Sequence, residues 1–359
     1  MSGSYPLFKA AAVQAGPVFL DLDASIEKAC GFIREAGANG ARLIGFPESY
    51  VPGFPAWIFK EGPMGHSATL FGRLYQNAVE IPSKAVARLS KAARDAQIYV
   101  CISVTERERG SLYLAQLWFD PNGDLIAKHR KLKPTGPERY IWGEGDGSML
   151  PVIPSPIGNL GGLLCWEHLV PLTSAAMSFK NEQVHVASWP VAAFVRGGPF
   201  EAMLDIREKY IGPINPADNP LNPLEVISRN YAMATQTFVL MCTHVMLQDA
   251  VDAMAPGSPP NTYQVGGGSS RIIAPDGSSI GENIPVGQEG LVYGNIPLEM
   301  VIYAKYMCDP GGHYAVPHIL SLNMNNAPAP AAAQTGQQSN PAPMRYADIQ
   351  ETDQVGDRS

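Results

Sequence analysis

The chain has 359 residues and a net charge of −7, from 26 Lys and Arg against 33 Asp and Glu. This acidic balance argues against a protein that binds nucleic acid or anionic lipid through its overall charge. Only 16% of the residues are charged and 45% are apolar, so the chain can bury a large core. Burial of surface in an oligomer would account for the low charged fraction.

The cysteines and the amino terminus indicate the cellular compartment. The five cysteines are widely spaced and form no Cys-x-x-Cys pair, which argues against a disulfide framework or a structural zinc site. The amino terminus lacks the continuous apolar stretch of a secretory signal. No segment reaches the roughly 18 uninterrupted apolar residues of a membrane helix. We therefore expect a soluble protein of the reducing cytoplasm.

Apolar runs bounded by turn residues predict strands that alternate with helices. The strands are expected at residues 8–14, 41–46, 98–104, 112–119, 125–132, 160–164, 184–189 and 238–243. The helices are expected at residues 26–36, 83–96 and 224–235, where apolar side chains recur at helical spacing. Pro-Asn-Gly and Pro-Asp-Gly turns predict hairpins at residues 112–132 and 271–280. This alternation predicts one α/β domain over residues 1–324.

Two local features complete this outline. Gly161 and Gly162 lie inside a predicted strand, where glycine usually indicates a close approach of another part of the chain. Residues 327–344 hold no charged side chain and consist mostly of Ala, Pro and small polar residues. This composition predicts a flexible tail over residues 325–359, which explains part of the low charged fraction.

Three reactive side chains, Glu48, Lys131 and Cys165, lie at or near the carboxyl ends of predicted strands. In an α/β fold such ends converge on one edge of the sheet, so these residues can meet. A thiol becomes a strong nucleophile when a base removes its proton and a cation stabilises the thiolate. Each residue also has an ordinary interpretation: Cys165 as core, Glu48 as a helix cap and Lys131 as part of a solvated basic strand.

Other kinds of site have less support. The run CWEH at residues 165–168 could indicate a Cys/His pair or a metal site, but no second cluster has ligand spacing. We interpret His168 as a hydrogen-bonded structural residue, and likewise His129, His185 and His244. The glycine-rich stretches match no phosphate-binding or dinucleotide-binding motif, and the Gly-x-Ser-x-Gly motif is absent. No cofactor is indicated.

Four ordered motifs connect the reactive residues with a known family. They are GFPESYVPG at residues 45–53, HRKLKPT at 129–135, GGLLCWEH at 161–168 and VHVASWP at 184–190. Together they resemble the nitrilase superfamily, and within it the nitrilase branch, over about residues 8–323. The chain departs from the usual pattern at Gly136 and at residues 315–318, which concern the pocket shape and the carboxyl-terminal contacts.

The resemblance implies a four-layer α-β-β-α sandwich and a mechanism without metal or organic cofactor. Cys165 would be the nucleophile, Glu48 the general base and Lys131 the cation that stabilises developing negative charge. Glu138 would match the family's second glutamate, which orients the lysine and the substrate. The thiolate would attack a nitrile carbon to give a thioimidate and then a thioester, releasing ammonia and a carboxylic acid. The backbone N–H of Trp166 would stabilise the tetrahedral stages.

The implied substrate is a small organic nitrile, with water as the second reactant. Trp166, Tyr50, Phe54, Trp189 and Pro190 are predicted to line an apolar pocket, although aromatic residues in such positions are as often plain core. The sequence leaves open whether aliphatic, arylaliphatic or aromatic nitriles are preferred.

The sequence also leaves two other functions open, and the resemblance implies an assembly state. A nitrile or cyanide hydratase would use the same thioimidate and release the amide. A non-catalytic, filament-forming scaffold would not need Glu48, Lys131, Glu138 or Cys165. Family members of this kind assemble through dimers into spirals or filaments, so we expect a homo-oligomer without nucleic acid or membrane partners.

Overall fold

The computed structural model describes residues 5–191, 199–212 and 222–329. Contacts group the chain into one unit of Met1–Ala327 and a second of Pro328–Ser359. Most of the predicted tail lies outside the described residues, so its flexibility and the boundary at residue 324 stay predictions. Within the described ranges no helix is long and apolar enough to cross a membrane.

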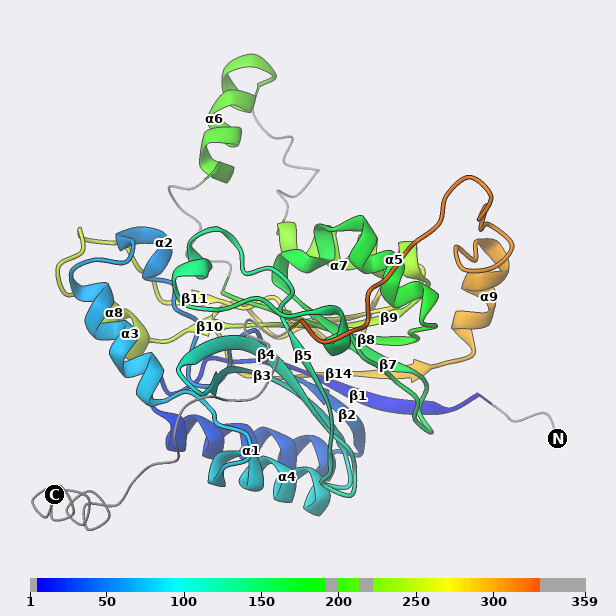
Figure 1. The fold of residues 1–359 in the computed structure, drawn as a ribbon, viewed down its shortest axis with the longest axis horizontal. Coiled ribbons are helices and arrows are strands. Elements are labelled where there is room, and N and C mark those ends of the chain that lie inside the picture. Colours follow the sequence, from blue (N-terminus) through cyan, green and yellow to red (C-terminus); the bar gives the residue numbers. More distant parts are fainter. Residues whose placement is uncertain (1–4, 192–198, 213–221, 330–359) are drawn as a thin grey trace, which may run out of the picture. The chain divides into compact units, whose positions relative to one another are not determined.

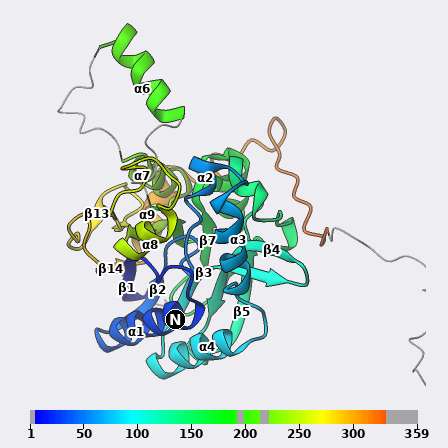
Figure 2. The same ribbon diagram turned by 90° about the vertical axis from the view of Figure 1, so that its left-hand side faces the viewer.

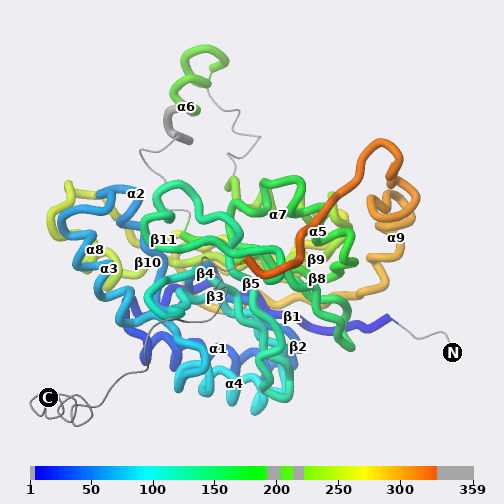
Figure 3. The backbone as a smooth tube through the Cα atoms, in the orientation of Figure 1, coloured from blue at the N-terminus to red at the C-terminus, as the bar shows by residue number. Residues whose placement is uncertain are grey.

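One extended sheet forms the centre of the fold. Its strand order is β5-β4-β3-β2-β1-β9-β8-β7-β6, with β14 paired to β1 and the hairpin β12-β13 paired to β9. Figure 3 shows the backbone of β14 running alongside β1. The strands are β1 (Leu7–Gln14), β2 (Ala41–Gly45), β3 (Tyr99–Glu108), β4 (Ser111–Phe119), β5 (Leu125–Arg130), β6 (Val152–Ile153), β7 (Leu160–Leu164), β8 (Val184–Trp189), β9 (Phe238–Thr243), β12 (Arg271–Ile273), β13 (Ser279–Ile280) and β14 (Gly290–Pro297). The short strands β10 (Val245–Met246) and β11 (Gly266–Gly267) pair with each other.

Helices connect many of these strands. They are α1 (Leu22–Ala38), α2 (Ile58–Glu61), α3 (His66–Gln76), α4 (Lys84–Ala96), α5 (Pro171–Phe179), α6 (Pro199–Tyr210), α7 (Pro223–Thr235), α8 (Gln248–Met254) and α9 (Met300–Met307), with short 3-10 helices η1 (Gly136–Tyr140), η2 (Gly147–Met149) and η3 (Cys165–Leu169). Asp21 and Ser83 cap α1 and α4 by accepting hydrogen bonds from backbone N–H groups. The predicted helices 26–36, 83–96 and 224–235 correspond to α1, α4 and α7.

The two halves of the sheet pack face to face. They join at β1 and β9, which share the single residue pair Gln14–Thr243. Leu43 and Cys101 from the first half share one buried cluster with Val186 and Leu240 from the second half. The alternation of side chains along each strand places the next residues on the outer faces.

Helices cover both outer faces. A second buried cluster joins α1 and α4 to the first half of the sheet, through residues such as Ile33 and Leu89. A third joins α5 and α7 to the second half, through Met177 and Ile227. Figure 1 shows α1 and α4 on one side of the strands and α5 and α7 on the other, and the turned view in Figure 2 shows the same order for α1, α4 and α7. The predicted α-β-β-α sandwich is confirmed.

The strand that ends at Cys165 needs its glycines because polar side chains cross it. A Cβ atom at Gly161 would lie 2.1 Å from Glu182 Oε1, and one at Gly162 would lie 2.7 Å from Gln116 Oε1. Gln116 Nε2 reaches from β4 to β8, donating to Ser188 Oγ at 2.9 Å. The close approach predicted from the glycines is therefore present, and it ties the two halves of the sheet together.

Candidate active site

The strand directions explain why the reactive side chains meet. Glu48, Lys131 and Cys165 follow the carboxyl ends of β2, β5 and β7. β2 runs parallel to β3 and to β1, and β7, β8 and β9 run parallel to one another and to β1. β5 is antiparallel to β4, which is antiparallel to β3, so β5 also points the same way. All three ends lie on one edge of the sandwich.

Lys131 lies between two carboxylates. Its Nζ donates to Glu48 Oε1 at 2.9 Å and to Glu138 Oε2 at 2.7 Å. Glu138 is on η1, and its Oε2 also accepts from the backbone N–H of Thr135 at 2.7 Å. All three side chains are at most 1% exposed. Burial alone would lower the pKa of Lys131, but the charges of Glu138 and Glu48 raise it well above its usual range, so the ammonium stays charged.

Glu48 has one bound oxygen and one free oxygen. Within the part of the chain that the structure describes, its buried Oε2 has no hydrogen-bond partner. Burial raises the pKa of Glu48 to about 8, against the opposing charge of Lys131. The Glu48 backbone N–H donates to Trp189 O at 3.1 Å, which crosses between the two halves of the sheet. Its carbonyl accepts from Nε2 of His244, whose pKa burial lowers to about 4. Because the pKa of Glu48 is about 8, its unpartnered Oε2 can exchange a proton near neutral pH.

We expect Glu48→Gln to be more stable than the wild type at neutral and alkaline pH. Between about pH 4.5 and 8 the unfolded carboxyl is ionised while the folded one keeps its proton, so the wild type loses stability as pH rises through this window. Glutamine does not titrate. The melting temperature of Glu48→Gln should exceed that of the wild type by at least about 3 °C at pH 8, and this difference should nearly vanish at pH 4.5.

Glu106 offers a control of opposite sign for this experiment. Its buried carboxylate is paired with Arg130 and Lys128, and although burial alone would raise its pKa, these two cations lower it. Glu106→Gln should therefore be less stable than the wild type at neutral pH, with a smaller deficit in acid. A pH-independent difference between Glu48→Gln and the wild type would contradict the high pKa of Glu48.

Cys165 begins η3 directly after β7, in a left-handed backbone conformation with φ of 51°. Burial and the charge of Glu48 raise the pKa of its thiol well above the usual range, while Lys131 and the backbone N–H of Trp166 act in the opposite direction. The resting side chain is thus a thiol, and it needs a base to become a nucleophile. Glu48, whose charge acts directly on this thiol, is the carboxyl group placed to serve.

A row of buried, hydrogen-bonded side chains lies behind Cys165. His168 Nδ1–H donates to Cys165 O at 2.5 Å, and His168 Nε2 lies 2.9 Å from His185 Nε2. Burial and the neighbouring His185 lower the pKa of His168 to about 3, so it is neutral and its Nε2 accepts from His185. His185 Nδ1 lies 2.7 Å from Glu182 Oε1, and Tyr231 OH donates to Glu182 Oε2 at 2.6 Å.

These hydrogen bonds agree with the prediction that His168 and His185 are structural residues. Glu182 and Tyr231 were not predicted, because the hydrogen bond between them joins residues 49 positions apart. The one local signal was the spacing of three residues between Glu182 and His185, just before and within β8. The row anchors the Cys165 carbonyl and so supports the left-handed turn at the nucleophile.

The five predicted pocket residues lie in different surroundings. Trp166 is 38% exposed, whereas Tyr50, Phe54, Trp189 and Pro190 are buried. Tyr50 packs against the rings of Phe46 and His244. Trp189 stacks on His168 with ring centroids 4.8 Å apart, and its Nε1 donates to Ser228 Oγ at 3.0 Å. The Trp189 side chain is thus part of the packing behind Cys165.

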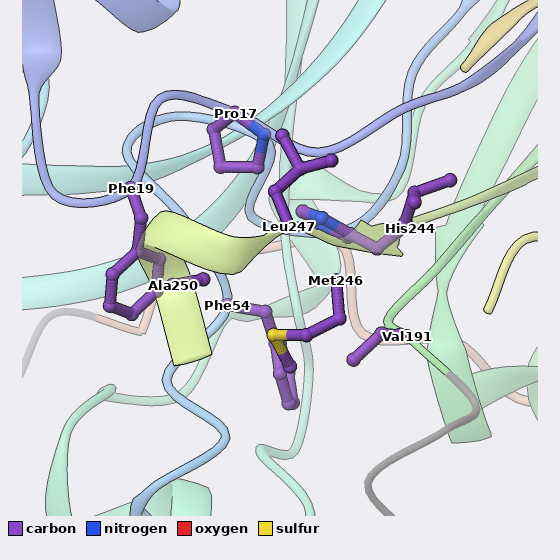
Figure 4. A pocket seen from close by; sticks show the side chains of 9 residues that line it. Pro17, Phe19, Phe54, Val191, His244, Met246, Leu247 and Ala250 are labelled. Carbon is purple, nitrogen blue, oxygen red and sulfur yellow. The ribbon is translucent and has the colours of Figure 1, made fainter. Parts of the chain in front are cut away.

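Phe54 lines a small apolar pocket, which Figure 4 shows from close by. Its wall includes side chains from β10, α8 and the loops after β1, β2 and β8: Pro17, Phe19, Phe54, Val191, His244, Met246, Leu247 and Ala250. His244, which lines this pocket, also hydrogen-bonds to the Glu48 carbonyl. Among the described residues, no group of three His, Cys, Asp or Glu side chains is arranged to hold a metal ion.

Comparisons with known proteins identify the family of this chain. The profile of the carbon-nitrogen hydrolase family matches residues 9–306. A solved carbon-nitrogen hydrolase from Helicobacter pylori G27 superposes with a TM-score of 0.64 at 17% identity, covering 84% of this chain and 92% of that one. The protein therefore belongs to the carbon-nitrogen hydrolase family.

Within this family the chain is similar to proteins named nitrilases. A nitrilase from Bacillus sp. (strain OxB-1) is 46% identical over 323 residues, which are 90% of this chain and 89% of that protein. An aliphatic nitrilase from Rhodococcus rhodochrous is 38% identical over 319 residues, or 88% of this chain and 79% of that protein. The family predicted from the four motifs is confirmed.

Proposed function

We propose that the protein hydrolyses an organic nitrile to the carboxylic acid and ammonia, with Cys165 as nucleophile. The observation that carries this proposal is the buried cluster in which Lys131 bridges Glu48 and Glu138 and Glu48 Oε2 is left free. Such a cluster supplies a base and a fixed cation beside a thiol. The similarity to nitrilases supports the choice of nitriles over other carbon-nitrogen bonds.

The first half of the reaction forms a covalent adduct. In its ionised form, which is the minor form at neutral pH because the pKa of Glu48 is about 8, Glu48 takes the thiol proton, and the sulfur of Cys165 attacks the nitrile carbon to form the carbon-sulfur bond. The nitrogen gains the proton, which gives a thioimidate. The Lys131 ammonium and the backbone N–H of Trp166 stabilise the negative charge that develops during attack.

The second half consumes two water molecules. Glu48 activates the first water, which adds to the thioimidate carbon, and ammonia leaves to give a thioester. A second water then breaks the carbon-sulfur bond, releasing the acid and restoring the thiol. Glu138 keeps Lys131 in place through both halves, since it holds both Nζ and the backbone N–H of Thr135. The overall balance is one nitrile and two waters to one acid and one ammonia.

The small apolar pocket has a volume of about 20 Å³, roughly the space of one water molecule, and is joined to Glu48 through His244. Phe54, which lines it, remains a proposed substrate-binding residue. Trp166, Tyr50, Trp189 and Pro190 remain proposed substrate-binding residues, and Trp166 is the most exposed of them.

A substrate panel with both products measured tests this function. The purified protein is supplied with cyanide, an aliphatic nitrile, an arylacetonitrile and benzonitrile, and ammonia and amide are quantified separately, with Cys165→Ala as the blank. We expect acid and ammonia in equal amounts from at least one organic nitrile. Amide as the main product would favour a hydratase, and no turnover of any member would favour the scaffold.

We further propose a cytoplasmic homo-oligomer. Beside the nucleophile, the segment from the end of η3 through α5 exposes Leu169, Val170, Leu172 and Phe179, of which Leu172 is 67% exposed. A second copy that covers these side chains would remove an apolar face from water. Sedimentation of the wild type and of Leu172→Glu tests this: the wild type should sediment as an oligomer and the variant as a smaller species. A wild type that stays monomeric at all concentrations would contradict the proposal.

A further inference from the structure

Glu167, two residues after the nucleophile, connects the two strand ends that carry Cys165 and Lys131. Its Oε2 accepts from the backbone N–H of Leu164 at 2.8 Å, directly before Cys165. Its Oε1 accepts from the backbone N–H of Leu132 at 2.7 Å, directly after Lys131. One carboxylate therefore binds the chain next to both reactive residues.

His129 completes this connection from β5. Its Nε2 lies 2.8 Å from Glu167 Oε2 and its Nδ1 lies 2.7 Å from Met149 O. Both ring nitrogens face acceptors, so both carry protons and the ring is a cation. Burial acts against this charge, but Glu167 raises the pKa of His129, and His129 in turn lowers the pKa of Glu167. The two form an ion pair, with side chains 0% and 4% exposed.

This ion pair joins the ends of β5 and β7, two strands that are not hydrogen-bonded to each other in the sheet. β5 is at one end of the strand order and β7 is near the other, so no strand pairing sets the distance between them. Gln116 on β4 makes a neighbouring link, a hydrogen bond of 3.2 Å to Leu163 O. The bonds of Glu167 are shorter, and two of them are made directly beside the reactive residues.

We infer that Glu167 is a positioning residue that fixes the Lys131 ammonium relative to the Cys165 sulfur, with His129 holding it in the charged form. The inference rests on the proposed function for its catalytic consequence. Glu167 takes no part in proton transfer, because its two oxygens are occupied by three donors. Only an ionised carboxylate can accept all three, since a carboxamide presents one oxygen and a nitrogen that donates.

The first test compares Glu167→Gln with Glu106→Gln. Glu106 is a matched control because its carboxylate is also buried and also paired with cations of β5. Its carboxylate bonds to the side chains of Lys128 and Arg130, whereas Glu167 bonds to the backbone N–H groups next to Lys131 and Cys165. We expect Glu167→Gln to lower kcat about 100-fold, the scale of a 1 Å misplacement, with KM changed by less than about threefold. Glu106→Gln should lower the melting temperature but leave kcat within about twofold.

A second readout does not depend on the nitrile. Iodoacetamide labelling of Cys165, followed by peptide mass spectrometry in a Cys308→Ala background, gives the pH midpoint of thiol reactivity. The titratable groups whose charges act on this thiol are Glu48, Lys131 and Glu138. Since Lys131 favours the thiolate, loosening its position in Glu167→Gln should raise the midpoint by about one pH unit. Glu106→Gln should keep the wild-type midpoint.

Two variants of His129, one that keeps an N–H donor and one that does not, test its role in holding Glu167. Gln at this position keeps an N–H that can donate to Glu167, whereas Leu removes it, so His129→Gln should retain at least about ten times the kcat of His129→Leu. The inference is overturned if Glu167→Gln loses no more kcat than Glu106→Gln, or if its labelling midpoint stays at the wild-type value. If the wild type hydrolyses no nitrile, the proposed function fails, while the labelling comparison still decides the role of Glu167.

Discussion

Replacing Cys165 with alanine is expected to abolish ammonia release and leave the fold intact. The sulfur forms the only covalent bond to substrate in the proposed reaction, so its loss should lower kcat on the order of 10⁴-fold or more. The residue is buried, and removing one sulfur atom there should cost about 1 kcal/mol of the free energy of unfolding. The measurement is ammonia release together with thermal unfolding of both proteins.

Cys308→Ala is the matched control, because Cys308 is a free, half-buried cysteine after α9 and outside the catalytic cluster. It should keep wild-type turnover. A wild-type sample quenched in acid during turnover should carry the mass of an acyl group on the peptide that contains Cys165. Ammonia release by Cys165→Ala at a rate near that of the wild type would rule out this thiol as the nucleophile.

Replacing Lys131 with methionine should reduce both turnover and stability. Methionine fills a similar volume but leaves Glu48 and Glu138 facing each other without a cation. We expect kcat to fall at least about 100-fold, the effect of losing one group that stabilises the developing charge. The free energy of unfolding should fall by about 3 kcal/mol, since a buried pair that loses one partner leaves an uncompensated charge.

A second variant separates these two effects. Lys131→Met combined with Glu138→Gln removes the uncompensated charge, so it should recover most of the lost stability and none of the turnover. Chemical denaturation and ammonia assays of both variants provide the comparison. Recovery of turnover in the double variant would mean that Lys131 contributes only to folding.

Much of the fold could be predicted from the sequence because each central strand is a short apolar run that ends at a turn or a polar residue. The predicted strand at residues 41–46 corresponds to β2, and the strand at 125–132 ends as β5 at Arg130, which places Lys131 just beyond it. The pairing of β14 with β1 could not be predicted, because it joins segments about 280 residues apart and carries no local signal. The helices α2, α3, α5, α6, α8 and α9 were also not predicted, although α3 buries Ser67, Leu70 and Leu74 at helical spacing.

The candidate site, like the fold, could be predicted only in part from the sequence. Strand ends and motifs pointed to Glu48, Lys131 and Cys165, because residues at the ends of parallel strands share an edge. The double contact of Lys131 and the free oxygen of Glu48 depend on side-chain geometry, which only the structure provides. Glu167 had no sequence signal of its own, since the backbone groups that it binds are ordinary leucines, one of them 35 residues away.

The glycines of β7 have a consequence for altering this protein by directed evolution. Gly161 and Gly162 have no room for even a methyl group, because Glu182 and Gln116 occupy the space above them. A mutagenesis library that includes these two codons would therefore consist mostly of misfolded members. Randomising Phe54, Val191 and Met246 changes the wall of the apolar pocket and leaves the glycine strand untouched. Variation that is meant to preserve the strand leading to Cys165 should therefore avoid Gly161 and Gly162.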